Sequence, residues 1–214
     1  PIRASIMHLL QGYLDQNIPI TLTSKIITEL NDVCIQQVIT IALKKMATPP
    51  PVKFGWLAMG SQGRSEQLLQ TDQDNALVYE DVPEELKEKT KKYFLELAGH
   101  VNKGLFEIGY EYCPAEMMAS NPKWCLSLEE WKKLVHHWIT NTGKDEVLLS
   151  FIFFDYSLSY GDSELVNKLS DFILEDIKAN PVFYLHLVSG ALQSPSPTGF
   201  FRDFLLEQDG ANKD

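Results

Sequence analysis

The strongest constraint on the fold is a short apolar run, Lys53–Met59, which stands between three consecutive prolines and the turn-forming sequence Gly60-Ser61-Gln62-Gly63. An apolar and aromatic run of this length, with turn signals on both sides, predicts a buried strand that feeds a tight turn. A second run, Asp74–Tyr79, contains Ala-Leu-Val and predicts another strand soon after the first. Two strands joined through a glycine turn favour a small sheet, which the rest of the chain must cover.

Helical periodicity flanks the two predicted strands. Before them, apolar side chains recur every three to four residues over 6–14 and over 24–46, and the prolines end the second of these helices. After them, the pattern predicts a long helix over 83–108, followed by a third strand or extended segment over 110–119. The strands therefore have helices on both sides of them along the sequence.

After Asn121-Pro122 the sequence changes from alternating predicted strands and helices to consecutive helical patterns. Ser127-Leu128-Glu129-Glu130 has the form of a capping box, which predicts that a helix begins there. Three more helical stretches are predicted near 146–156, 163–179 and 181–192. The last part of the chain is therefore predicted to be helical.

These patterns predict an α+β fold, a small mixed sheet flanked by helices. We expect an N-terminal helical segment over residues 1–48, an α/β core over 49–120 and a C-terminal helical unit over 121–214. We also expect the helical unit to be truncated at its C-terminus. A chain of 214 residues is long enough to bury a real hydrophobic core.

The charge balance limits the partners of this chain. Lys and Arg number 19 and Asp and Glu number 29, for a net charge of −10, which argues against a diffuse electrostatic hold on nucleic acid or on an anionic membrane. The longest uncharged stretch, 179–201, is interrupted by polar residues and does not predict a membrane span. Cys34, Cys113 and Cys125 lack metal-motif and disulfide spacing, so we expect free thiols and a cytoplasmic location.

Two aspartates, Asp72 and Asp74, lie at the start of the second predicted strand. Alternate residues of a strand project from the same face, so the two carboxylates would lie side by side and would need a cation between them. Oxygen ligands favour Mg²⁺, which is usually shared with substrate phosphates, and the Gly60-Ser61 turn offers N–H groups and a hydroxyl to a phosphate. Together they predict a nucleotide–metal site, although either feature alone would more often be a polar strand end or an ordinary turn.

Several common motifs do not fit this segment. No Gly-Lys-Ser/Thr follows the turn, which excludes a P-loop, and Gly60 and Gly63 without a third glycine are not a dinucleotide fingerprint. Leu77 and Pro83 occupy the positions where an EF-hand loop needs Gly and Glu.

The order of strand, Gly-Ser turn and D-x-D on the next strand resembles the nucleotidyltransferase superfamily typified by DNA polymerase beta. More specifically, the segments 60–67 and 71–77 are similar to the nucleotidyltransferase family found beside CBS domain pairs in bacterial signalling proteins, a family related to PII uridylyltransferase and glutamine-synthetase adenylyltransferase. This resemblance implies the small mixed sheet of a nucleotidyltransferase. Further matches are Cys113-Pro114, Met118–Trp124, Phe153–Asp155, Tyr160–Asp162 and Gly199–Arg202.

The resemblance implies a nucleotide-binding role for the residues of the turn. Gly60, Ser61 and Gly63 would hold the nucleotide phosphates, and Arg64 would neutralise phosphate charge. Glu66 would orient Arg64; alternatively, the two residues form a structural ion pair.

The resemblance also implies a catalytic metal site. Asp72 and Asp74 would bind Mg²⁺ or Mn²⁺, and a third carboxylate usually completes such a cage. Glu116 is the predicted third carboxylate, with Glu111 as the alternative. Asp155, with Arg202 as a possible partner, would contact the acceptor or support the site, or would be a structural pair.

The implied activity is transfer of a nucleoside monophosphate from an NTP to a hydroxyl of a protein or small molecule, as in protein adenylyl- or uridylyltransferases. The expected partners are an NTP, an acceptor and, in a longer chain, CBS or other regulatory domains of bacterial signalling. The alternative is a catalytically weak module that senses a nucleotide, and the lack of an identified third carboxylate would favour it.

Overall fold

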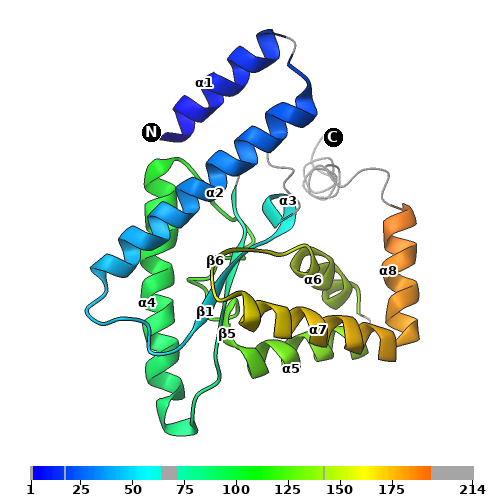
Figure 1. Cartoon of the computed structure of the whole chain (residues 1–214). Coiled ribbons are helices and arrows are strands. Elements are labelled where there is room, and N and C mark those ends of the chain that lie inside the picture. Colours follow the sequence, from blue (N-terminus) through cyan, green and yellow to red (C-terminus); the bar gives the residue numbers. More distant parts are fainter. Residues whose placement is uncertain (1, 17, 64–71, 142, 194–214) are drawn as a thin grey trace, which may run out of the picture.

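The structure is a computed structural model that describes residues 2–16, 18–63, 72–141 and 143–193. Figure 1 shows helices on both sides of a central sheet. The helices are α1 (Ile2–Asp15), α2 (Ile20–Lys45), α3 (Gly60–Gly63), α4 (Glu84–Ile108), α5 (Leu128–Thr140), α6 (Lys144–Phe154), α7 (Ser163–Ala179) and α8 (Pro181–Gln193). The strands are β1 (Phe54–Ala58), β2 (Asp72–Gln73), β3 (Asn75–Tyr79), β4 (Glu111–Tyr112), β5 (Cys125–Ser127) and β6 (Ser157–Gly161).

The main sheet has the strand order β5-β3-β1-β6. β1 is antiparallel to both β3 and β6, whereas β3 is parallel to β5, so the predicted mixed sheet is confirmed. A separate pair, β2 and β4, is parallel and continues from the end of the sheet at which β3 begins. Every residue of β1 and β3 is buried, because helices cover both faces of the sheet.

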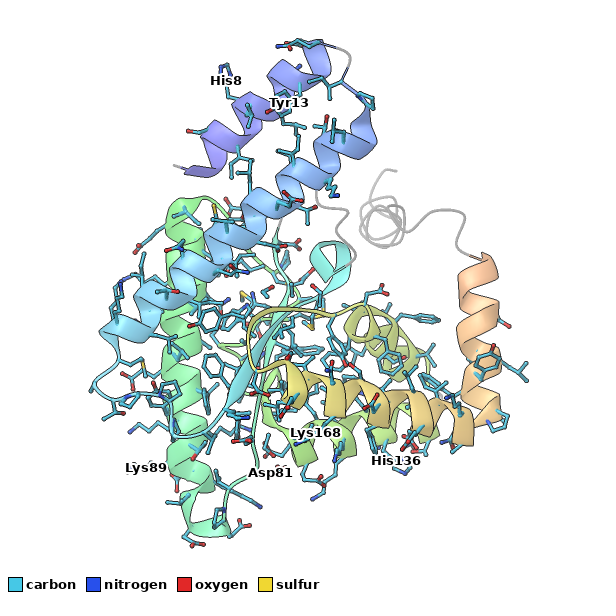
Figure 2. The ribbon with its side chains drawn as sticks, viewed as in Figure 1. His8, Tyr13, Asp81, Lys89, His136 and Lys168 are labelled. Atoms are coloured by element: carbon cyan, nitrogen blue, oxygen red, sulfur yellow. The ribbon has the colours of Figure 1, made fainter. Side chains whose placement is uncertain are left out.

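Two hydrophobic cores lie on the two faces of the sheet. Leu77 and Tyr79 of β3 pack with residues of α2 and α4, whereas Ala76 and Val78 pack with residues of α5, α6 and α7. Successive residues of a strand point to opposite faces, which assigns them to different cores. Side chains from the helices fill the space on both faces (Figure 2).

The helix predictions agree with the structure except at some ends. The capping box is confirmed: Ser127 Oγ accepts a hydrogen bond from Glu130 N, and the Glu130 carboxylate accepts one from Ser127 N. α2 begins at Ile20 rather than at residue 24, directly after Pro19, whose ring fixes its φ at −55°. Of the extended segment predicted over 110–119, only Glu111–Tyr112 forms a strand, because Pro114 cannot donate a hydrogen bond to a ladder.

Among the described residues, Lys25–Lys45 is the one helical stretch long and apolar enough to cross a membrane by length and composition. The core helix of a soluble protein passes the same test, so this is weak evidence for a membrane span. Here α2 packs along α4, with Ile35, Ile39 and Ala42 buried. Gln36 Nε2 also donates a hydrogen bond to a main-chain carbonyl of β6, at 3.2 Å.

The helices after residue 120 share their core with the sheet. β5 and β6, which come from this part of the chain, are strands of the main sheet. Trp131 of α5 donates its indole N–H to the main-chain carbonyl of Leu77 at 3.0 Å and stacks on Phe153 of α6, with ring centroids 4.3 Å apart. This packing holds α5 and α6 directly against β3.

Candidate metal and nucleotide site

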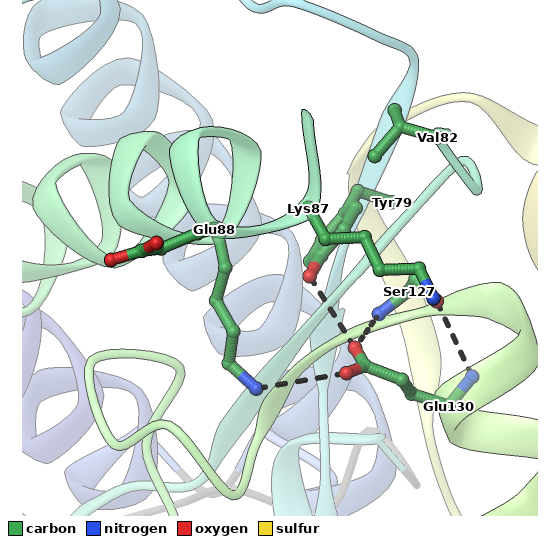
Figure 3. Close-up of a pocket in the computed structure, with 7 residues that line it drawn as sticks. Tyr79, Val82, Lys87, Glu88, Ser127 and Glu130 are labelled. Carbon is green, nitrogen blue, oxygen red and sulfur yellow. Dashed lines mark hydrogen bonds and ion pairs between the residues drawn. The ribbon is translucent and has the colours of Figure 1, made fainter. Parts of the chain in front are cut away.

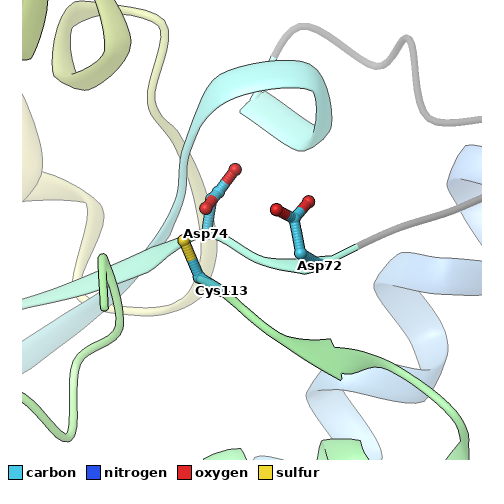
Figure 4. Close-up of side chains that lie close together, drawn as sticks. All are labelled: Asp72, Asp74 and Cys113. Carbon is cyan, nitrogen blue, oxygen red and sulfur yellow. The ribbon is translucent and has the colours of Figure 1, made fainter. Parts of the chain in front are cut away.

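Asp72 and Asp74 lie where β2 passes into β3, next to the α3 turn (Figure 4). The main-chain carbonyl of Asp74 accepts a hydrogen bond from Met59 N at 3.0 Å, which joins this segment to the end of β1. Both carboxylates project toward α3 in Figure 4. The structure therefore brings together the paired aspartates and the glycine turn that the sequence predicts to converge.

Buried amides hold the backbone between the two aspartates. Gln73 Nε2 donates a hydrogen bond to the carbonyl of Asn102 on α4 at 3.1 Å, and Asn102 Nδ2 donates to Gln73 Oε1 at 2.8 Å and to Asn75 Oδ1 at 3.1 Å. Asn75 Oδ1 also accepts from Ala119 N at 2.8 Å. Because Gln73 and Asn75 are anchored on the α4 side, the alternating aspartates face the other way. Sequence reasoning missed this amide network.

The α3 turn depends on its glycines. Gly60 has a φ of +56°, which disfavours other residues, and a Cβ at this position would lie 3.3 Å from Asp74 Oδ2. A Cβ on Gly63 would lie 1.7 Å from the carbonyl oxygen of Asp155. Gly63 is therefore required for close packing of the turn against the end of α6, and its predicted nucleotide contact stays a prediction.

Asp74 is a buried carboxyl group, with an exposed fraction of 7%. Burial, followed by the charge of Asp72, raises its pKa from 3.8 to about 7, while a hydrogen bond from Cys113 acts in the opposite direction. Its Oδ1 atom is buried without a hydrogen-bond partner. A cation beside the two carboxylates would satisfy this oxygen and offset the repulsion, so these residues fit a divalent metal.

Cys113 is the third group at this site. One ligand atom each from Asp72, Asp74 and Cys113 lie within 4.8 Å of one another. Burial, followed by the charge and hydrogen bond of Asp74, raises the pKa of the Cys113 thiol to about 12, whereas backbone hydrogen bonds from Met117 and Ala115 lower it. The spacing of Cys113 from the other cysteines does not indicate that it lies beside the aspartates. Its place in the Cys113-Pro114 motif is the one feature of the sequence that could have drawn attention to it.

The predicted third carboxylates lie elsewhere. Glu116 is exposed, has a φ of 55° in the turn after Cys113, and is not part of the group formed by the two aspartates and the thiol. Glu111 is also exposed, although its backbone pairs with Asp72 in the β2–β4 ladder. A catalytic role for either glutamate stays a prediction.

The remaining candidates are only partly described. Asp155 ends α6 beside the α3 turn, through its contact with Gly63. Arg64, Glu66 and Arg202, together with the side chain of Ser61, lie outside the described residues. Their proposed contacts therefore stay predictions.

A cavity of about 210 Å³ lies at the far end of β3 from the aspartates (Figure 3). Its central carboxylate, Glu130, accepts a hydrogen bond from Ser127 N at 2.8 Å and lies 4.0 Å from Lys91 Nζ. Glu130 belongs to the capping box of α5, so these contacts stabilise a helix end. The cavity is lined by Tyr79, Val82, Lys87, Glu88, Lys91, Ser127 and Glu130.

Comparison with known proteins gives one family match. The model of a family described as "Putative nucleotidyltransferase DUF294" matches residues 4–145, well over half of the chain. The matched range includes the α3 turn, the two aspartates and the thiol. No curated protein matches the chain significantly.

Proposed function

This chain belongs to the family described as Putative nucleotidyltransferase DUF294, and on that premise we propose that it transfers a nucleoside monophosphate from an NTP to a hydroxyl acceptor. The observation that carries the proposal is the convergence of Asp72 and Asp74 with the Gly60 turn. Paired carboxylates beside a glycine turn suit a metal-bound triphosphate, because Mg²⁺ is usually shared between carboxylates and substrate phosphates.

In the proposed reaction the acceptor oxygen loses its proton and forms a bond to the α-phosphorus, while the bond to pyrophosphate breaks. Asp72 and Asp74 would hold Mg²⁺ or Mn²⁺, which when bound supplies positive charge to the phosphate oxygens. The amide network holds Gln73 and Asn75, the two neighbours of Asp74, and would thereby orient the carboxylates before substrate binds. Positioning and electrostatics would therefore provide most of the catalysis.

The remaining predicted residues would act around the two aspartates. Gly60, Ser61 and Gly63 would bind the phosphates, and Arg64 would neutralise their charge. Glu66 would orient Arg64. Asp155 and Arg202 would act on the acceptor side, where the helices after residue 120 reach the turn. The acceptor is proposed to be a protein or small molecule in bacterial signalling, with CBS or other regulatory domains as partners in a longer chain.

A second candidate function is a nucleotide-sensing module with weak catalysis. It is favoured by one observation: within the described ranges, no third carboxylate joins Asp72 and Asp74. Incubation with α-labelled NTPs, Mg²⁺ and a cell extract separates the two functions. A labelled acceptor supports the transferase, whereas binding without any labelled product supports the sensor.

Calorimetric titration of each NTP, with Mg²⁺ and with EDTA, tests the metal-dependent site. We expect Mg²⁺ to raise NTP affinity, and thermodynamic linkage requires NTP to raise Mg²⁺ affinity by the same factor. Asp72→Asn and Asp74→Asn should each abolish this coupling, while Asp171→Asn on the exposed face of α7 should retain it. Tight NTP binding that neither EDTA nor the two substitutions change would contradict the proposal.

A further inference from the structure

The acidic pair shares its space with a buried thiol. The ligand atoms of Asp72, Asp74 and Cys113 lie within 4.8 Å of one another, and Cys113 has an exposed fraction of 4%. Independently, Asp74 Oδ1 is buried and has no hydrogen-bond partner, and its carboxylate points into the same space (Figure 4). A buried acceptor that no donor satisfies, beside a second carboxylate and a sulfur atom, indicates a cation position rather than a polar strand end.

Strand pairing places the sulfur at this position. β2 and β4 are parallel, with Asp72 opposite Glu111 and Gln73 opposite Tyr112. The ladder ends at Gln73 and Tyr112, so Asp74 and Cys113 are the residues that directly follow the two paired strands. The loop after the thiol is fixed as well: Glu116 N donates to the carbonyl of Cys113, and the carbonyl of Met117 accepts from the first residue of β3, both at 3.0 Å. The short ladder and these loop hydrogen bonds therefore position the sulfur beside the two carboxylates.

We propose that Cys113 is a third metal ligand, so that the site takes a divalent transition metal of the zinc class in preference to Mg²⁺. This inference rests on the proposed function, because it concerns the cation of the same site. Mg²⁺ is a hard cation that takes oxygen ligands, whereas sulfur selects softer metals. On binding, the thiol proton leaves to solvent and the thiolate coordinates. Three protein ligands leave open positions for a phosphate oxygen or water.

Cobalt(II) is the probe for this proposal, because a sulfur–cobalt bond gives an intense charge-transfer band in the near ultraviolet that oxygen ligands do not give. We expect the full chain loaded with Co²⁺ to show this band, and an excess of Mg²⁺ to leave it in place. Cys113→Ser should lose the band and weaken Co²⁺ binding by at least about 10- to 100-fold, the loss typical of removing a residue that only supports a metal ligand. Cys125→Ser is the matched control: Cys125 is also buried, but it packs in the core on the α4 side of the sheet and should leave the band unchanged.

X-ray absorption of the Co²⁺-loaded wild type gives a second measurement that needs no variant. Sulfur in the metal's coordination sphere is expected; a sphere of oxygen and nitrogen atoms alone would overturn the inference, as would a band that persists in Cys113→Ser. Failure of the thiol ligand can be distinguished from failure of the proposed function. Coupled binding of Mg²⁺ and NTP without cobalt–sulfur coordination would reject only the thiol ligand, whereas cobalt–sulfur coordination without any NTP binding would reject the transferase.

Discussion

At the scale of single residues, Asp74 makes stability depend on pH. Burial, and then the charge of Asp72, raises its pKa from 3.8 to about 7, so over that range the folded chain keeps a proton that the unfolded chain has released. The metal-free protein should therefore lose stability as pH rises from about 4 to about 8, by at most about 4 kcal/mol from this group. Urea denaturation across this range should show that Asp74→Asn lacks the loss and is the more stable protein at the upper end.

The comparison of variants isolates this carboxyl group from the other titrating residues. Asp171→Asn, on an exposed face, should follow the wild-type pH dependence. If Asp74→Asn and wild type changed in parallel over the whole range, the raised pKa would be wrong.

The glycine turn offers a second test at this scale. A Cβ on Gly63 would overlap the carbonyl oxygen of Asp155, so Gly63→Ala must move the turn away from α6. We expect a loss of about 1–3 kcal/mol in the free energy of unfolding, together with weaker metal–NTP coupling. Gly99→Ala is the control, because this exposed helical glycine has open space around it, and the change should stabilise the protein by about 1 kcal/mol. Equal effects of the two substitutions, measured by urea denaturation, would contradict the packing argument.

The sequence predicts the aspartate pair but not the residue beside it. Asp72 and Asp74 could be found because alternation along a strand is a local property. Cys113 reaches them only through the pairing of β2 with β4, which joins segments far apart in the sequence. Metal and disulfide motifs are recognised from the spacing between cysteines. That spacing carries no information about a thiol whose neighbours are carboxylates.

At the scale of elements, α4 holds the segment that carries the aspartates through Asn102, and we expect this contact to orient them. This side chain satisfies Gln73 and Asn75 and accepts a hydrogen bond from Ser120 N at 3.1 Å. Asn102→Ala removes the partners of Gln73 Oε1 and of the Ser120 N–H, while Asn75 Oδ1 keeps its hydrogen bond from Ala119 N. We expect a loss of about 1–3 kcal/mol in stability and a reduced coupling between Mg²⁺ and NTP. Denaturation and calorimetry measure the two effects separately.

The neighbouring exposed residue of the same helix provides the reference. Lys103→Ala should change stability by no more than about 0.5 kcal/mol and leave the coupling intact. A folded Asn102→Ala variant with full metal–NTP coupling would show that the network supports the fold without orienting the carboxylates.

Predictability differs between kinds of element. The long amphipathic helices could be predicted because their periodicity is repeated over many residues, as in α4, and because a capping box marks the start of α5. The sequence does not predict β5 and β6 as strands. β5 has three residues that end at the helix cap, and β6 is polar at alternate positions, so each is recognisable only from its pairing with β3 or β1.

At the scale of the whole molecule, the predicted division at residue 120 crosses a continuous core. Trp131 joins the two sides through its contacts with Leu77 and Phe153. Trp131→Ala should reduce the free energy of unfolding by about 3–5 kcal/mol, and it should lower the stability of sheet and helices together. Tyr184→Ala, at an exposed position of α8, is the control and should have little effect.

Near- and far-ultraviolet circular dichroism followed during the same denaturation tests this cooperativity. Coincident transitions are expected for wild type and variant. Two separated transitions in the wild type would contradict a shared core.

The four residues from Asp72 to Asn75 send acids to one side and amides to the other. A consequence concerns insertions and deletions rather than substitutions. Gain or loss of one residue between the two aspartates would leave Asp72 and Asp74 on opposite sides of the strand, so that one carboxylate would face the amide network. Substitutions can therefore adjust the side chains one at a time, whereas a one-residue change in the length between the aspartates separates the two carboxylates in a single step.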